Sequence, residues 1–512
     1  MLSAQNITLR TLAEGHELIR ALSFTINPGE KIAIIGHEGT GKSTLLKWLE
    51  NPDSVDYADG SGQVIKDGRT GYLEQDIRSR WGAFTPLEYF TKSSPEGADE
   101  PHRYEWLDRL SKLLRQVGFP ETKYDETRRL SQYSGGEIVK LGLVKLLLAD
   151  PEILLLDEPT NDLDFDTILF LEQFIATAEQ AILYISHDER LLSQTATGIV
   201  HLRRVHQKTK AESAFLRVDY DTYRDLTLSA YEKSRRQALK ERADYKKKMI
   251  RFQRIYERTK HLQDQAVRNP TGGRLLKKKM KSLKSQEKRF EKDREDFTPI
   301  PEPDLAIELS FSSNSALPKG RRVCTIDWPS LSINGNHLSG PIKLDIKGAE
   351  KIGIIGANGV GKTTLLKRLV ETLKHHPSLI VGWMPQDYST LENAASALAF
   401  LMEEPDREQE AKVRKMMGAM QFERAEMTAP THQLSGGQKC KLYLLKMVLD
   451  GCNVLILDEP TRNLSPLSAP HVHALLADFA GCIVAVTHDR TFLEAVFDSV
   501  LLLDQDGLHA VP

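Results

Sequence analysis

Several features that mark common protein classes are scarce or missing in this chain of 512 residues. There are four cysteines, Cys324, Cys440, Cys452 and Cys482, and none of them forms a C-x-x-C pair. This pattern argues against a zinc or iron–sulfur site and favours buried thiols in a reducing cytosol. No run of about eighteen uncharged apolar residues appears, so no membrane-spanning helix is expected. The first residues lack the basic and apolar regions of a secretion signal, and we therefore expect a soluble, cytoplasmic protein.

The chain as a whole has no large excess of either charge, because its net charge is only −2. It is unevenly distributed, however. The stretch 232–296 holds roughly 23 Lys and Arg against roughly 10 Asp and Glu, so the remainder of the chain is acidic. Such an asymmetry indicates one segment with a polyanionic partner. The length predicts two or three domains.

The chain carries four short motifs twice, in the same order. Three of them recur at the same offset of 301 residues, which chance does not produce, and the chain therefore contains a duplicated domain. The copies are GHEGTGKST from Gly36 and GANGVGKTT from Gly356, SGG from Ser134 and from Ser435, LDEPT with Glu158 and with Glu459, and SHD with His187 or THD with His488.

The first motif pair is offset by 320 residues, so the first half holds about 19 extra residues after its glycine-rich motif. They fall partly before Gln75 and partly in 76–133, and we expect them to lengthen surface loops. In both halves, short apolar runs end in glycine or in carboxylates, as buried parallel strands do. Strands that alternate with helices predict an α/β fold with a parallel sheet and ligands at the carboxyl ends of its strands.

The pattern G-x-x-x-x-G-K-[ST] fits residues 36–43 and 356–363. Its glycines let backbone N–H groups surround phosphates, its lysine reaches the β- and γ-phosphates, and the following helix presents its positive end. A solvated glycine-rich turn is the alternative, and it is disfavoured because both copies lie between a strand and a helix. The nucleotide-binding residues expected here are Gly36, Gly39, Gly41, Lys42, Ser43 and Thr44 in the first half and Gly356, Gly359, Gly361, Lys362, Thr363 and Thr364 in the second.

Adjacent carboxylates end one apolar strand in each half, Asp157-Glu158 and Asp458-Glu459. Such pairs are costly unless they meet a cation or take part in chemistry, although a solvated strand end is the usual interpretation of a lone acidic pair. We expect the aspartates to hold Mg²⁺ and Glu158 and Glu459 to polarise the attacking water. The expected metal ligands are Ser43, Gln75 and Asp157 in the first half and Thr363, Gln386 and Asp458 in the second.

Each half also carries a glutamine before the acidic pair and a histidine after it. A lone histidine at a strand end is usually structural. The distances from Glu158 to His187 and from Glu459 to His488 are the same, however, and favour a role at the γ-phosphate. Gln75 and Gln386 follow apolar residues in matching contexts, and a glutamine there could sense Mg²⁺ and the attacking water.

A serine followed by two glycines opens an expected helix in each half. This arrangement forms an anion site, or only an N-cap. Because each half already has a phosphate loop, a second anion site would serve the nucleotide of the other half. The residues are Ser134, Gly135 and Gly136, and Ser435, Gly436 and Gly437.

With all these motifs in order, the sequence resembles the ATP-binding-cassette superfamily, roughly over 1–204 and 308–512. The resemblance implies an ATP hydrolase with ATP and Mg²⁺ as cofactors, in which two cassettes pair head to tail. It also implies the composition of two shared sites. One pairs Lys42, Gln75, Glu158 and His187 with Ser435, and the other pairs Lys362, Gln386, Glu459 and His488 with Ser134.

The sequence departs from the family pattern in the loop after the second acidic pair. Ser465 stands where the first half has the aspartate Asp164, and Arg462 replaces the usual asparagine. That loop faces the other cassette in the family, so we expect the two sites to hydrolyse ATP at unequal rates. No clear aromatic residue for stacking adenine stands at the family's usual upstream place.

The basic stretch between the halves has apolar residues at heptad-like steps, interrupted at 269–273 by NPTGG. These steps predict two long helices folded as an antiparallel hairpin, with apolar seams inward and Lys and Arg outward. A charged spacer is the alternative, but the charge is of one sign and clusters near the turn. The seams are Tyr245, Met249, Phe252 and Tyr256, and Leu276, Met280, Leu283 and Phe290; the turn cluster is Arg268, Arg274, Lys277, Lys278, Lys279 and Lys281.

Tandem cassettes joined by a basic helical linker resemble the ABC-F family. This resemblance implies a cytoplasmic protein that binds the ribosomal exit (E) site, with its linker near ribosomal RNA and transfer RNA, as a translation factor or an antibiotic-resistance protein. We expect a monomer with intramolecular cassette pairing and domains at 1–215, 216–305 (the linker) and 306–512. The rivals are a transporter ATPase subunit, a DNA-repair cassette ATPase, and an ATP-gated clamp whose hydrolysis is incidental.

Overall fold

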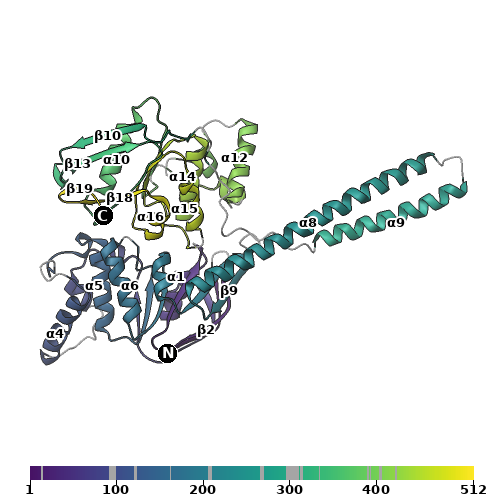
Figure 1. Cartoon of the computed structure of the whole chain (residues 1–512). Helices are drawn as coiled ribbons and strands as arrows, with labels where there is room; N and C mark the ends of the chain where they lie inside the picture. Colours follow the sequence, from purple (N-terminus) through teal and green to yellow (C-terminus); the bar gives the residue numbers. More distant parts are fainter. Residues whose placement is uncertain are drawn as a thin grey trace. The chain divides into compact units, whose positions relative to one another are not determined.

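The structure is a computed structural model of the chain (Figure 1). It describes residues 1–12, 15–37, 39–91, 100–119, 124–161, 163–205, 210–265, 270–295, 311, 315–333, 335–388, 391, 394–402, 406–420, 422, 424–466 and 468–511. The chain divides into two compact units. One contains Met1–Asp221 and Asp304–Pro512, and the other is Thr222–Pro303.

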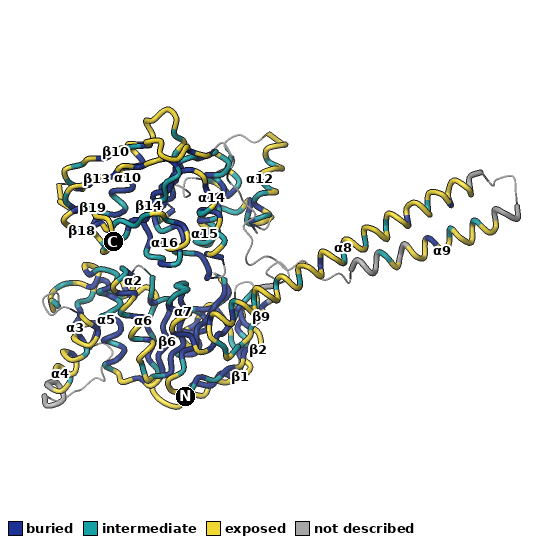
Figure 2. The backbone as a smooth tube through the Cα atoms, in the orientation of Figure 1, coloured by how far each residue is buried: buried dark blue, intermediate teal, exposed yellow. Residues whose placement is uncertain are grey.

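The first cassette is built on a six-stranded sheet of order β5-β6-β7-β3-β8-β9, in which only β9 runs antiparallel to its neighbour. Every residue of β3, β6 and β7 is buried, as strands covered on both faces require, and β6 lies in the dark blue interior of Figure 2. The predicted parallel α/β sheet is confirmed. Its strands are β3 (Lys31–Gly36), β5 (Thr70–Leu73), β6 (Ile153–Asp157), β7 (Ala181–Ile185), β8 (Gly198–Val205) and β9 (Lys210–Leu216).

A three-stranded antiparallel sheet completes the first cassette, with order β2-β1-β4, where β1 is Leu2–Thr11, β2 is Glu17–Ile26 and β4 is Ala58–Lys66. The expectation that the extra residues before Gln75 only lengthen surface loops is wrong. They include β4, whose backbone pairs with β1 from Leu2 to Thr11. The pairing satisfies backbone groups that would otherwise lie on an edge of this sheet.

The helices of the first cassette surround the larger sheet and include the three that position the site, α1, α5 and α7. Leu45 and Leu46 of α1 are fully buried in one apolar cluster with Ile34 and Leu155 of the sheet. The helices are α1 (Lys42–Glu50), α2 (Ile77–Trp81), α3 (Pro86–Thr91), α4 (Glu100–Gln116), α5 (Gly135–Leu148), α6 (Phe165–Thr177) and α7 (Glu189–Thr195), with short 3₁₀ turns at Pro52–Ser54 and Leu130–Gln132.

The second cassette repeats the larger sheet with order β15-β16-β17-β14-β18-β19, and again only its last strand is antiparallel. Two further pairs, β10-β13 and β11-β12, are antiparallel. The strands are β10 (Arg322–Trp328), β11 (Leu331–Ile333), β12 (Asn336–Ser339), β13 (Ile342–Lys347), β14 (Lys351–Ile355), β15 (Val381–Met384), β16 (Val454–Asp458), β17 (Cys482–Val486), β18 (Ser499–Asp504) and β19 (Gly507–Ala510).

The helices of the second cassette follow the same order along the chain as those of the first. They are α10 (Lys362–Lys374), α11 (Ala397–Leu401), α12 (Arg407–Ala419), α13 (Arg424–Thr428), α14 (Gly436–Leu449), α15 (Ala469–Ala477) and α16 (Arg490–Val496), with a 3₁₀ turn at Thr431–Gln433.

The linker forms the predicted antiparallel pair of helices, α8 (Tyr220–Gln265) and α9 (Pro270–Glu295) (Figure 1). The 46 residues of α8 correspond to about 70 Å of helix. The apolar seam is confirmed, because the ring of Phe252 meets that of Phe290 edge to face with centroids 5.6 Å apart, and Tyr245 packs against Phe290 in the same way. The predicted break at 269–273 is partly wrong, because residues 270–273 already belong to α9, whose first residue Pro270 stands where a helix tolerates proline. Arg268 and Asn269 lie outside the described residues.

Within the described ranges, no helix combines the length and the apolar character needed to cross a membrane.

Candidate functional site

Two glycine-rich loops join a buried strand to a helix, β3 to α1 and β14 to α10. Gly41 and Gly361, the N-caps of these helices, have φ values of 93° and 103°. L-residues with side chains rarely adopt this left-handed backbone. A Cβ on Gly361 would also lie 3.0 Å from side-chain carbons of Leu331 and Leu338. The two loops therefore have the backbone that glycine allows and that lets N–H groups converge on an anion.

The lysine of each loop is folded back over it. Lys42 Nζ donates to the carbonyl oxygens of Gly36 at 2.8 Å and His37 at 3.2 Å, and Lys362 Nζ donates to that of Gly356 at 2.7 Å. Both lysines are buried, with 6% and 8% of their surface exposed. Burial lowers the pKa of Lys362, and Glu459 opposes this effect. Each ammonium group is thus held at its loop, where phosphate oxygens could replace the carbonyls.

Hydroxyl and carboxylate oxygens meet beside each loop. Ser43 Oγ donates to Asp157 Oδ1 at 2.9 Å, and Thr363 Oγ1 donates to Asp458 Oδ2 at 2.7 Å. Both aspartates are buried, and burial raises the pKa of Asp157 to about 6, against its hydrogen bonds. Mg²⁺ prefers such oxygen ligands, and a buried carboxylate is stabilised by a cation. These residues therefore fit Mg²⁺.

Tyr72 contacts a residue proposed to hold Mg²⁺, and the sequence did not reveal this contact. Its hydroxyl donates to Asp157 Oδ2 at 3.0 Å, from the neighbouring strand β5. In the second cassette the same sheet position belongs to Trp383, which pairs with Ile456 as Tyr72 pairs with Leu155. The indole has no hydroxyl to donate. The sequence gives only a weak signal for this contact, which is a tyrosine in the short strand that pairs with the strand ending at Asp157.

Glu158 has three polar neighbours from other parts of the first cassette. Gln75 Nε2 donates to its Oε2 at 2.7 Å, Asn161 Nδ2 donates to the same oxygen at 2.5 Å, and His187 Nε2 lies 3.4 Å from Oε1. Burial alone would raise the pKa of Glu158, but His187, Lys42 and Asn161 together hold it at about 2. The first cassette therefore brings Gln75, Glu158 and His187 together, as predicted, with Glu158 ionised.

Glu459 has different surroundings. His488 Nε2 lies 3.7 Å from Glu459 Oε1, and the backbone N–H of His488 donates to Oε2 at 3.3 Å. Burial and the Asp458 carboxylate raise the pKa of Glu459, against Lys362. Burial and Lys362 lower the pKa of His488 to about 4, so this imidazole is neutral at pH 7. Arg462 stands where the first cassette has Asn161, and the two glutamates are thus electrostatically unequal.

The backbone of both glutamates is also unusual, because Glu158 and Glu459 have φ values of 47° and 51°. Non-glycine residues in this region are uncommon and cluster at functional sites.

The two SGG motifs begin α5 and α14, and their serines are N-caps. Ser134 Oγ accepts from the backbone N–H of Glu137 at 3.3 Å, and Ser435 Oγ accepts from that of Gln438 at 3.3 Å. The N-cap alternative is therefore correct as a local role. Gly136 allows the side chain of Thr167 to approach the start of α5 closely, since a Cβ on Gly136 would lie 2.6 Å from Thr167 Oγ1.

A cavity of about 1510 Å³ joins residues of both cassettes. The phosphate loop, Gln386, Glu459 and His488 of the second cassette line it together with Ser134 and Gly135 of the first. The structure thus brings together the group that the family resemblance implied for this site. Gln75 and His187, expected at the other site, also line this cavity. Its described lining does not include Lys42 or Ser435, and their pairing stays a prediction.

The loop after the acidic pair differs between the cassettes, as expected from Asp164 and Ser465. Asp164 Oδ1 accepts a hydrogen bond from Thr167 N at 3.1 Å, and Asp164 lines the cavity. Its negative charge favours the protonated forms of Lys362 and His488 of the other cassette and so opposes the lowering of their pKa values. Ser465 is buried and its Oγ donates to Ser468 Oγ at 2.9 Å. A carboxylate therefore reaches across to the second cassette's site.

Comparisons with known proteins identify both halves. A family model described as ABC transporter matches residues 19–161 and 340–462. Similar proteins include the ribosome protection protein VmlR of Bacillus subtilis, 29% identical over 96% of this chain and 85% of that protein, and the ATP-binding protein Uup of Buchnera aphidicola, 26% identical over 96% of this chain and 78% of that protein. Among solved structures, an RNase-L inhibitor matches with a TM-score of 0.60 at 16% identity, over 98% of this chain and 90% of that chain, which shows the shared fold.

Proposed function

Because this chain belongs to the ATP-binding-cassette family and the ABC-F resemblance is confirmed by its relatives, we propose that this ATP hydrolase acts on the ribosome through its basic hairpin. In this proposal the protein is a cytoplasmic monomer that binds the exit (E) site of the ribosome. Its linker contacts ribosomal RNA and transfer RNA, and the protein serves as a translation factor or in antibiotic resistance.

The observation that carries the proposal is the charged surface of the hairpin. Its described lysines and arginines from Lys246 to Lys260 and from Arg274 to Lys284 are all exposed, whereas Phe252 and Leu283 are buried in the seam. Exposed cations on a stiff helical pair suit the phosphate backbone of RNA, and their binding would release counterions. A relative that aligns with 96% of this chain is named a ribosome protection protein, which supports this choice of polyanion.

In the proposed reaction, the phosphate loops bind the triphosphate of ATP. Lys42 and Lys362 exchange loop carbonyls for phosphate oxygens, which adds charge-assisted hydrogen bonds. Ser43 with Asp157, and Thr363 with Asp458, would hold Mg²⁺, which neutralises phosphate charge when bound. Glu158 and Glu459 orient and polarise the attacking water, and His187 and His488 meet the γ-phosphate.

Cassette pairing supplies the link to the ribosome. Ser134 and Gly135 at the start of α5 lie at the same cavity as Lys362, so a nucleotide bound there would touch both cassettes. ATP then favours the paired state through its contacts to both sides, and hydrolysis removes that preference. We propose that the ATP-bound state holds the ribosome and that hydrolysis releases it.

The test is the full chain with Glu158→Gln and Glu459→Gln together, which retains nucleotide contacts and removes both carboxylates. In ATP the double variant should co-sediment with ribosomes at least ten-fold more than the parent, and the excess should fall steeply with salt. Lys42→Ala with Lys362→Ala is the matched control, which should not respond to ATP. Equal sedimentation of the double variant and the parent would refute the proposal. Recovery with a membrane protein instead would support the transporter-subunit alternative.

A further inference from the structure

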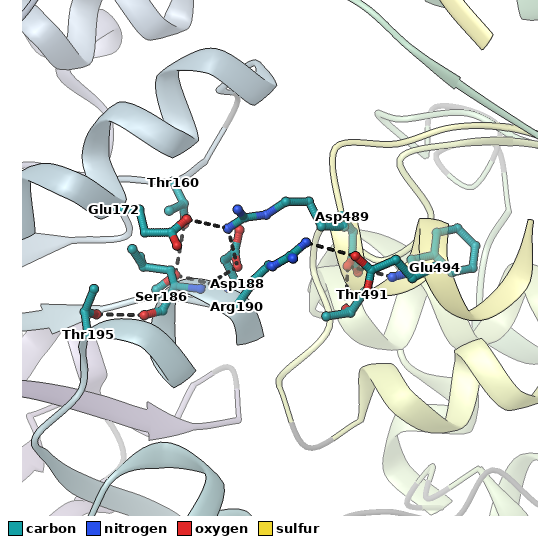
Figure 3. A network of polar contacts seen from close by, with 12 residues as sticks. Thr160, Glu172, Ser186, Asp188, Arg190, Thr195, Asp489, Thr491 and Glu494 are labelled. Carbon is teal, nitrogen blue, oxygen red and sulfur yellow. Dashed lines mark hydrogen bonds and ion pairs between the residues drawn. The ribbon is translucent and has the colours of Figure 1, made fainter. Parts of the chain in front are cut away.

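A buried ion pair joins the two cassettes at residues that the motif analysis left unassigned. Arg490 of the second cassette donates from Nη2 to Glu172 Oε2 of the first at 2.7 Å. The same Nη2 lies 3.7 Å from Asp188 Oδ1, also of the first cassette. The side chains of Arg490 and Glu172 are only 5% and 9% exposed. Glu172 and Asp188 are labelled in Figure 3, which draws this network.

The positions of these residues along the chain connect the pair to both sites. Arg490 begins α16 two residues after His488, and Asp188 directly follows His187. Asp188 and Asp489 each cap a helix through one oxygen, accepting from Leu191 N and Phe492 N at 2.9 Å. The backbone on both sides of the ion pair is therefore held by helix caps, so a movement of one side is transmitted to the other rather than absorbed.

A continuous set of contacts consequently runs from one glutamate to the other. It passes from Glu158 to His187 at 3.4 Å, along the chain to Asp188, and across to Arg490 at 3.7 Å. It continues along the chain to His488, which lies 3.7 Å from Glu459. We propose that Arg490 is a positioning residue for ATP hydrolysis that couples the two sites, so that the state of one histidine loop sets the position of the other. This proposal rests on ATP hydrolysis and does not depend on the ribosome.

The energetics favour coupling over simple attachment. A buried guanidinium that loses its partners leaves uncompensated charge, and the same holds for the carboxylates, so separation of the loops is disfavoured. A second ion pair at this interface, Arg190 with Glu494 at 2.9 Å, is 42% and 69% exposed (Figure 3). Exposed pairs contribute little. The interface thus offers a matched control, an arginine that joins the same two cassettes without burial.

The experiment measures how the loss of one site affects the other. Steady-state ATP turnover is compared for the full chain, for Glu158→Gln and for Glu459→Gln, each with Arg490 intact and with the neutral pair Arg490→Met/Glu172→Gln. With Arg490 intact, we expect each single Glu→Gln change to lower turnover about ten-fold or more, as coupled sites do. With the neutral pair, each site works alone, so the two fractional activities that remain after the single changes should add up to about one.

Two further variants separate coupling from folding. Arg190→Met removes the exposed ion pair and should leave the large effect unchanged. If the neutral pair destabilises the fold in a thermal melt, Arg490→Lys retains the buried charge and should reduce the effect partly. Retention of the full effect in the neutral pair, or an equal loss with Arg190→Met, would overturn the proposal. Neither result bears on ribosome binding, which is scored separately by sedimentation.

Discussion

Tyr72 provides a means to weaken one metal site while the other is left intact. Tyr72→Phe removes the 3.0 Å hydrogen bond to Asp157 and keeps the aromatic ring. A hydrogen bond to a charged group contributes about 1.5–3 kcal/mol, so the ionised carboxylate should lose stabilisation of that order. Since about 1.4 kcal/mol corresponds to ten-fold in an equilibrium constant, protonation of Asp157 should become about ten-fold or more favourable, and the Mg²⁺ concentration for half-maximal turnover at the first site should rise toward that factor where protons compete.

The pH dependence of the defect follows from the same contact. Burial raises the pKa of Asp157 to about 6 and the Tyr72 hydrogen bond opposes that rise, so its loss should raise the pKa further. Protons and Mg²⁺ compete for the carboxylate. The requirement for Mg²⁺ should therefore increase as the pH falls toward and below that pKa, and the defect should be larger at about pH 6.5 than at about pH 8.5.

The assay is ATP turnover against Mg²⁺ concentration in the Glu459→Gln background, where Glu158 is the remaining glutamate of the two proposed to be catalytic. The control is Trp383→Phe in the Glu158→Gln background, because Trp383 occupies the equivalent sheet position without a hydroxyl. We expect less than a two-fold change there. Identical Mg²⁺ curves for Tyr72→Phe and its parent, or a defect that does not vary with pH, would show that the hydrogen bond does not support the metal site.

Three further outcomes follow from the structure. In the Glu158→Gln background, turnover should rise from neutral to alkaline pH, because burial and Asp458 raise the pKa of Glu459 and its protonated form cannot polarise water. In the Glu459→Gln background, turnover should not change over this pH range, because Glu158 is ionised throughout. Equal pH profiles in the two backgrounds would contradict the electrostatic inequality of the two glutamates. Gly361→Ala should weaken ATP binding at the second cassette by more than about ten-fold in a fluorescent-nucleotide titration, since φ is 103° and Leu338 leaves no room, and unchanged binding would refute this reason. Phe252→Ala should destabilise the hairpin by about 3–5 kcal/mol and accelerate amide hydrogen exchange in α9 about 100-fold or more, because Phe252 is buried against Phe290 in the seam. Leu275→Ala is the control, because Leu275 is 69% exposed, and it should do neither. Equal hydrogen exchange in the two variants would contradict the seam.

The sequence predicted those parts of the fold that depend on local pattern. Apolar runs that end in glycine or carboxylate became buried parallel strands, and heptad-like steps became the Phe252–Phe290 seam. The exception was β4, because its residues alternate weakly and only its pairing with β1 makes them a strand. Extra residues between motifs carry no signal of whether they will pair with a distant edge.

For the site, motif spacing found the residues proposed to bind phosphate and metal but missed those that act between elements. Tyr72 reaches Asp157 only because β5 and β6 are neighbours, and Arg490 meets Glu172 only because the cassettes pack together. Both contacts join residues that lie far apart in the sequence. The inequality of the sites was partly foreseen from Ser465 and Arg462, but the opposite pKa shifts of the two glutamates depend on burial, which spacing does not report.

The Arg490–Glu172 contact also bears on which cassettes can pair with which. By the 301-residue offset, Glu189 of the first cassette corresponds to Arg490, and His473 of the second corresponds to Glu172. If two first cassettes of separate chains paired, Glu189 would face Glu172, and two second cassettes would place Arg490 against His473. The first arrangement brings carboxylates together without an opposite charge, and the second replaces the Glu172 carboxylate with an imidazole. In a twofold homodimer the two patches must be self-complementary, whereas duplication within one chain removes that constraint. This contact thus selects the unlike partner and disfavours the pairing of two like cassettes.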